Sequence, residues 1–131
     1  MKGHVLLVED HPDDELLTLH MLRKNAITDV VVTREGMEAN TYLFVDNEYR
    51  VECKSYLPEL ILLDLRLPKM DGFELLAKIR SDKRTRDIPV VVLSSSQHKK
   101  DMDRCRELGA SAFITKPLDA EKMSVIKKFM K

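Results

Sequence analysis

The chain has 131 residues, and its 22 Lys and Arg side chains balance 22 Asp and Glu side chains. This length suits one domain with one core, and the zero net charge gives no general attraction to nucleic acid or an acidic membrane surface. Aliphatic runs are about four residues long, far short of the roughly 20 that cross a bilayer, and the N-terminus has no signal-peptide pattern. We therefore expect a single domain over residues 1–131, soluble and cytoplasmic.

Short apolar runs alternate with segments of helical periodicity along the whole chain. The apolar runs are rich in aliphatic and β-branched residues and too short for helices, which predicts strands. In chain order the sequence predicts strand 4–9, helix 13–25, strand 29–33, helix 36–47, strand 60–65, helix 72–81, strand 88–96, helix 98–108, strand 111–116 and helix 119–130. The polar segment 46–59 is predicted to be a surface loop.

The strands do not alternate apolar and polar residues, which indicates that both faces of the sheet are covered. Repeated strand–helix units with right-handed crossovers predict an α/β fold with a doubly wound, five-stranded parallel sheet. Pro12 is predicted to open the first helix, Gly109 to follow the fourth and Asp119 to cap the last. In such sheets ligands bind outside the carboxyl ends of the strands.

Charged and hydroxyl side chains stand where four of the predicted strands end: Glu9 and Asp10, then Asp64, Ser94 and Lys116. If the strands are parallel, these groups share one edge of the sheet. Three carboxylates placed together repel one another, and a hard cation with oxygen ligands relieves that conflict. Mg²⁺ is the expected ion, with Mn²⁺ as the alternative. Zinc is not expected, because no cluster of Cys and His residues has ligand spacing.

A metal site with a lysine and a hydroxyl beside it points to phosphoryl transfer, which depends on positioning and charge neutralisation. Asp64 is the candidate nucleophile, which would form an aspartyl phosphate. Lys116 and the Ser94 hydroxyl would each hold a phosphoryl oxygen. An ordinary ion pair between a carboxylate and Lys116 is the alternative. Because charged or hydroxyl groups stand at four strand ends together, the phosphoryl-transfer site is favoured over the ion pair.

The stretches LLVEDHPDD, LILLDLRLPKMDGFELL, IPVVVLSSS and AFITKPLD resemble, in order, the four signatures of the response-regulator receiver domain. The resemblance extends from Val5 to about Phe129. It implies a CheY-like fold with the flavodoxin-like strand order 2-1-3-4-5. The long 46–59 segment is similar to that of stand-alone receivers paired with phytochrome-type histidine kinases.

The resemblance also implies roles for single residues. Asp64 matches the phosphorylated aspartate. Glu9 and Asp10 match the acidic pair that holds Mg²⁺, with Asp10 the direct ligand and Glu9 acting through water. The backbone carbonyl of Arg66 matches the group that completes the metal site. Many relatives have aspartate where this chain has Glu9, which keeps the charge and adds a methylene group.

Three further matches concern the switch and the phosphoryl group. Ser94 matches the switch hydroxyl, where threonine is common, and Phe113 matches the switch aromatic residue, where tyrosine is common. Lys116 matches the lysine that contacts the phosphoryl group. The Lys116–Pro117 bond is typically cis in the family, whereas the general preference of X-Pro bonds predicts trans.

The resemblance implies a signalling protein that receives a phosphoryl group from a histidine kinase or a phosphotransfer protein. It is not an enzyme beyond self-catalysed phosphorylation and dephosphorylation. Output would pass through a downstream protein partner, homodimerisation or onward phosphotransfer, without direct contact with nucleic acid or a membrane. The alternative is a receiver-like interaction module that works without phosphorylation. A flavin site is disfavoured because the acidic residues after the first strand would repel a phosphate.

Overall fold

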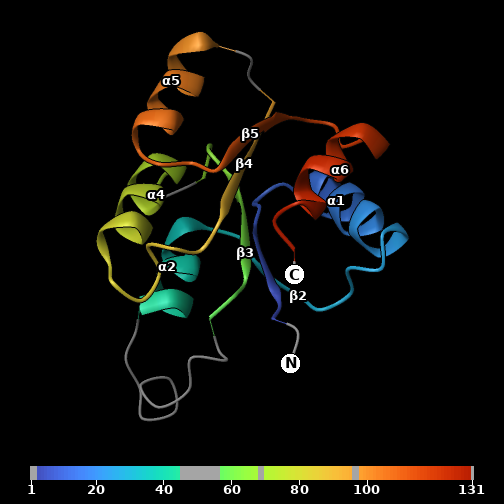
Figure 1. Ribbon diagram of the computed structural model, residues 1–131, viewed down its shortest axis with the longest axis horizontal. Coiled ribbons are helices and arrows are strands. Elements are labelled where there is room, and N and C mark those ends of the chain that lie inside the picture. Colours follow the sequence, from blue (N-terminus) through green and yellow to red (C-terminus); the bar gives the residue numbers. More distant parts are fainter. Residues whose placement is uncertain (1–2, 45–56, 68–69, 96–97, 131) are drawn as a thin grey trace.

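A computed structural model describes residues 3–44, 57–67, 70–95 and 98–130 of the chain. Its centre is a five-stranded parallel sheet in the order β2-β1-β3-β4-β5 (Figure 1). The strands are β1 Val5–Val8, β2 Val30–Thr33, β3 Leu60–Asp64, β4 Val90–Ser94 and β5 Ala112–Thr115. The α/β class and the predicted strand order are both confirmed.

Helices cover both faces of this sheet (Figure 1). They are α1 Pro12–Lys24, α2 Gly36–Phe44, α4 Gly72–Ser81, α5 Lys99–Glu107 and α6 Ala120–Lys127. Helices α1 and α6 lie on one face, and α2, α4 and α5 lie on the other. Among the helices that the structure describes, none combines the length and the apolar character that a membrane span requires.

The two-sided cover explains the uninterrupted apolar runs in the sequence. In β1, Leu6 and Val8 belong to the core on the α2, α4 and α5 side, whereas Val5 and Leu7 belong to the core on the α1 and α6 side. Strand β3 divides its residues between the two cores in the same way. Each large side chain buried in this way contributes about 1.5–3 kcal/mol. The central strands are therefore a rigid support for groups placed at their ends.

The predicted element ends agree with the structure to within a few residues. Pro12 is the first residue of α1, Asp119 accepts a capping hydrogen bond from the Lys122 amide, and Gly109 has φ +94° after α5. The helix expected over 36–47 is described to Phe44, and most of the loop expected over 46–59 lies outside the described residues. The Lys116–Pro117 bond is cis, so the expectation from general X-Pro preference was wrong.

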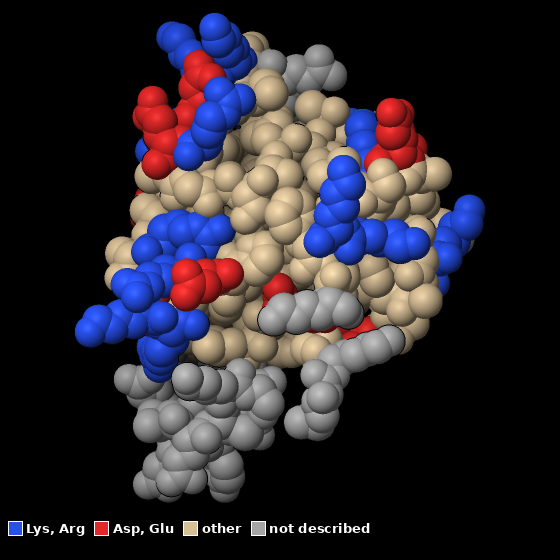
Figure 2. Space-filling model, in the orientation of Figure 1, with Lys and Arg blue, Asp and Glu red and all other residues tan. Residues whose placement is uncertain are grey.

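Basic side chains gather over α4 and the turn that follows it (Figure 2). Segment 78–87 contains Lys78, Arg80, Lys83, Arg84 and Arg86. Arg80 differs from the other four because it is half-buried. Its guanidinium donates hydrogen bonds to three backbone carbonyl oxygens, those of Ile88 at 2.6 Å, Gly109 at 2.8 Å and Arg86 at 3.0 Å. Arg80 thereby joins α4 to the connections before β4 and before β5.

Replacing Arg80 with Met is expected to lower the free energy of unfolding by about 1–3 kcal/mol, because the carbonyl oxygen of Ile88, in a part-buried contact, and the more exposed ones of Gly109 and Arg86 lose a charged donor. Urea denaturation of the variant beside the wild type measures this difference. Arg86→Met is the matched control, because the Arg86 side chain is exposed and its carbonyl is kept. Equal losses in the two variants would contradict the structural role of Arg80.

Candidate functional site

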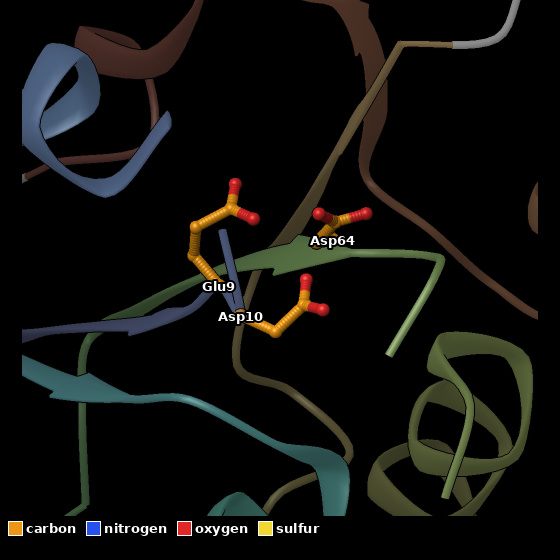
Figure 3. A group of neighbouring side chains, drawn as sticks. All are labelled: Glu9, Asp10 and Asp64. Carbon is orange, nitrogen blue, oxygen red and sulfur yellow. The ribbon is translucent and has the colours of Figure 1, made fainter. Parts of the chain in front are cut away.

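Three carboxylates meet at the carboxyl edge of the sheet, as Figure 3 shows. Strands β1 and β3 pair with Val8 opposite Leu63, so the residues that come next in each strand lie side by side. Glu9, Asp10 and Asp64 each offer an oxygen atom, and these atoms all lie within 4.8 Å of one another. Glu9 is 1% exposed and Asp64 8% exposed, whereas Asp10 is open to solvent. The topology thus brings together the three acids that the strand ends suggested.

Lys116 supplies the positive charge of the site. It follows β5, and its Nζ donates to Glu9 Oε1 at 2.5 Å, to Asp64 Oδ2 at 2.9 Å and to Asp14 Oδ2 at 3.0 Å. Its side chain is 10% exposed. The Lys116 amide also donates to the carbonyl oxygen of Ser94 at 2.8 Å, which fastens the residue to the end of β4. The ammonium therefore sits among three carboxylates on a well-supported loop.

Asp14 is the site residue that the sequence reasoning missed. Its only signal was its place in the acidic run that begins at Glu9, and such runs are usually solvated surfaces. In the structure Asp14 lies in the first turn of α1 and contacts Lys116 across the site. This contact depends on how α1 lies against the sheet, which the sequence pattern alone does not reveal.

Both oxygen atoms of Asp64 have a donor. Oδ2 accepts from Lys116, and Oδ1 accepts from the Arg66 amide at 3.0 Å. The loop that carries Arg66 approaches α4 closely at Gly72, whose amide donates to the Leu65 carbonyl oxygen at 3.0 Å. A Cβ atom at Gly72 would lie 2.6 Å from the Leu65 Cα and 2.7 Å from the Asp64 carbonyl oxygen. Glycine is therefore needed here to hold the loop, and with it the Asp64 carboxylate, in place.

Ser94 and Phe113 lie on the neighbouring strands. Ser94 ends β4, is buried, and pairs with Thr115 of β5. Phe113 pairs with Val92 and is half-buried beside the core on the α5 side. Side chains two residues apart in a strand share a face, so Ser94 points to the same side as Val92. Phe113 also lines a pocket of about 280 Å³ between α5 and β5.

The surroundings change the proton affinities of two groups. Burial, followed by the neighbouring Asp64, raises the pKa of Glu9 to about 7, although Lys116 opposes this shift. Burial alone would lower the pKa of Lys116, but hydrogen bonds to Glu9 and Asp64 outweigh it, and the pKa lies above its ordinary value. Lys116 is thus charged at neutral pH, and the site has a surplus of carboxylates.

This surplus suits a divalent cation with oxygen ligands. Carboxylates from Glu9, Asp10 and Asp64 provide hard oxygen donors with an open, solvent-facing side, which is the arrangement that Mg²⁺ and Mn²⁺ accept. Cys105, by contrast, is a buried thiol whose pKa burial raises to about 11. Among the described residues, Cys105 lies in the core and does not belong to the cluster of Glu9, Asp10 and Asp64.

In the metal-free protein, Glu9 is expected to make stability fall as pH rises from 4.5, its ordinary pKa, to about 7. Over that range the unfolded chain has released a proton that the folded protein keeps, so raising the pH favours unfolding. We expect a loss of about 1–3 kcal/mol, measured by urea denaturation in the presence of a chelator. Glu9→Gln should remove this slope. A slope that persists in that variant would show that another group causes it.

Comparison with known proteins shows clear relatives. The family model of the response regulator receiver domain matches residues 5–127. Response regulator Rcp1 from Synechocystis sp. is 39% identical over 113 residues, which cover 86% of this chain and 75% of Rcp1. The solved structure of its Mn²⁺-bound form has a TM-score of 0.77 at 34% identity, over 97% of this chain and 88% of that chain.

Two further solved structures are similar over nearly the whole chain. The bacteriophytochrome response regulator AtBRR has a TM-score of 0.84 at 40% identity, covering 99% of this chain and 93% of its own. The phosphorylated cyanobacterial phytochrome response regulator RcpA has a TM-score of 0.81 at 38% identity, covering 98% of this chain and 91% of its own. These proteins are therefore similar to this chain in both fold and sequence.

Proposed function

Because the chain belongs to the response regulator receiver family of two-component signalling proteins, we propose that Asp64 accepts a phosphoryl group from a histidine kinase or a phosphotransfer protein. The observation that carries this proposal is the setting of Asp64. Its two oxygen atoms are held by the Lys116 ammonium and the Arg66 amide, and two more carboxylates lie beside it. Such a site can orient a nucleophile and neutralise charge on a phosphoryl group.

In the proposed reaction an Asp64 oxygen attacks the phosphorus atom, and the bond from phosphorus to the donor breaks. The donor keeps the electron pair of that bond. Lys116 disperses the negative charge that develops on the phosphoryl oxygens. When bound, Mg²⁺, with Mn²⁺ as the alternative, would supply further positive charge there, held by Glu9, Asp10, Asp64 and the backbone carbonyl of Arg66.

Ser94 and Phe113 are proposed to transmit the change. The Ser94 hydroxyl would move toward the phosphoryl group, and Phe113 would turn into the space that opens. This turn would shift an existing equilibrium between two forms of the surface made by α5, β5 and α6. The pocket of about 280 Å³ that Phe113 already lines between α5 and β5 supports the idea that this region can repack.

The wider biological role is part of the same proposal. We take residues 1–131 as one receiver domain that acts in the cytoplasm and has no activity besides self-catalysed phosphorylation and dephosphorylation. Its output would reach a downstream protein partner, a second copy of the chain or a further phosphotransfer protein, with no direct contact with nucleic acid or membrane. The phytochrome response regulators among the relatives support pairing with a phytochrome-type histidine kinase.

Labelling with acetyl phosphate tests the phosphorylation itself. Wild-type protein with Mg²⁺ should gain the mass of one phosphoryl group, and peptide mapping after borohydride reduction should place it on Asp64. A chelator should prevent the gain. If the wild type takes up no phosphoryl group, the protein is instead an interaction module that works without phosphorylation.

A further inference from the structure

The contact between Asp14 and Lys116 has no part in the reaction proposed above. Asp14 Oδ2 lies 3.0 Å from Lys116 Nζ, and the Asp14 side chain is 35% exposed while that of Lys116 is 10% exposed. The Asp14 carboxylate therefore approaches the ammonium from the solvent side of the site. Glu9 and Asp64 approach the same ammonium from the protein interior.

The Lys116 ammonium has no hydrogen to spare in this arrangement. An ammonium group has three hydrogens to donate, and the contacts with Glu9, Asp14 and Asp64 account for all three. A phosphoryl oxygen can be bound by Lys116 only if one of these carboxylates gives up its hydrogen bond. Which contact is kept then decides where the ammonium stays during the reaction.

The proposed reaction would draw two of these three carboxylates, Glu9 and Asp64, away from Lys116. Glu9 and Asp64 belong to the group of carboxylates whose oxygen atoms approach one another within 4.8 Å, and a cation or a phosphoryl group would engage them. Asp14 does not belong to that group. Its hydrogen bond to Lys116 is therefore the contact that neither a cation nor the phosphoryl group needs to break.

The helix that carries Asp14 has contacts of its own with β2 and with the core. Glu15, the next residue, forms an ion pair with Arg34 after β2, through Nε at 3.1 Å and Nη2 at 3.2 Å. Further along α1, Leu22 is fully buried in the core that it shares with Met123 of α6. The position of Asp14 is thus set by contacts at both ends of α1.

We propose that Asp14 is a positioning residue that keeps the Lys116 ammonium beside Asp64 while the other two carboxylates change partners. This inference rests on the proposed phosphorylation of Asp64. Without Asp14, the flexible lysine side chain has no fixed partner at the moment when a phosphoryl oxygen must be bound. A misplaced charge lowers the rate of transfer even though every reacting group is still present.

The test compares Asp14→Asn with Asp13→Asn, because the two variants remove the same charge from the same helical turn. Asp13 is exposed, and no contact between it and Lys116 is found among the described residues. With acetyl phosphate and saturating Mg²⁺, we expect Asp14→Asn to slow labelling of Asp64 about tenfold, and Asp13→Asn to change it less than about twofold. The Mg²⁺ concentration that gives half the maximal rate should be similar in both, and Asp14→Glu should restore part of the rate.

Equal rates for Asp14→Asn and Asp13→Asn would overturn the proposal. So would faster labelling of Asp14→Asn than of the wild type, because Asp14 would then compete with the phosphoryl group for Lys116. The wild type offers a second measurement that needs no variant. In a crystal structure with Mg²⁺ and beryllofluoride, the Asp14–Lys116 hydrogen bond should remain, and its absence would also overturn the proposal. Wild-type protein that is not labelled on Asp64 would instead refute the underlying function.

Discussion

Asp64→Asn is expected to abolish labelling by acetyl phosphate, because an amide oxygen is a far weaker nucleophile than a carboxylate. Intact-mass measurement should show no phosphoryl adduct under conditions that label the wild type fully. The other carboxylates at the site are not expected to take over. Glu9 is 1% exposed and points its charge at Lys116, and among the described residues the Lys116 ammonium and the Arg66 amide donate to Asp64 and not to Asp10.

The loss of labelling in Asp64→Asn should occur in a folded protein. Asn at this position keeps the size of the side chain and removes one charge from a group of carboxylates that repel one another. We therefore expect circular dichroism and urea denaturation to show a folded variant with stability close to that of the wild type. Asp87→Asn, at an exposed position, is the control and should be labelled normally. Undiminished labelling of Asp64→Asn would show that Asp64 is not the phosphoacceptor.

Lys116→Met is expected to have a double effect. In a chelator, the free energy of unfolding should fall by about 3 kcal/mol, because Glu9, Asp14 and Asp64 lose the cation that they share. With Mg²⁺ present the loss should be smaller, because a divalent ion also neutralises the carboxylates. The rate of labelling should fall by about a hundredfold even at saturating Mg²⁺, since the charge that faces the phosphoryl oxygens is gone.

The matched control for this variant is Lys127→Met, which removes an exposed lysine from α6. It should change neither the unfolding free energy measured in chelator nor the labelling rate by more than a small amount. If Lys116→Met and Lys127→Met behave alike, the buried ion pairs of Lys116 are of no consequence. If Lys116→Met is destabilised but labelled at the normal rate, Lys116 supports the fold and has no part in phosphoryl transfer.

Most of the fold could be predicted from the sequence, because buried positions must be apolar. Strands β1, β3 and β4 are covered on both faces, so nearly every position in them must be apolar, and the runs VLLV and LILLD follow from that requirement. A charged residue at the end of such a run marks the place where the cover of helices stops. For this reason the sequence alone predicts Glu9 and Asp64 as site residues.

Contacts between polar residues that depend on the position of a helix could not be predicted from the pattern of apolar residues. The contact of Asp14 with Lys116 joins residues 102 positions apart, and it exists only because α1 lies at a particular angle on the sheet. The bonds from Arg80 to three carbonyl oxygens likewise depend on where α4 meets two connecting segments. Composition and periodicity describe which face of a helix is buried, but they do not describe what its polar residues reach.

The sequence by itself determined the alternation of strands and helices, the two-sided cover of the sheet and the placing of acids, hydroxyl and lysine at strand ends. It could do so because these features arise from local burial and from the shared direction of parallel strands. Only the tertiary structure decided the raised pKa of Glu9, the three-carboxylate setting of Lys116 and the inclusion of Asp14. Each of these depends on distances between elements, and electrostatic energy varies with those distances and with the exclusion of water.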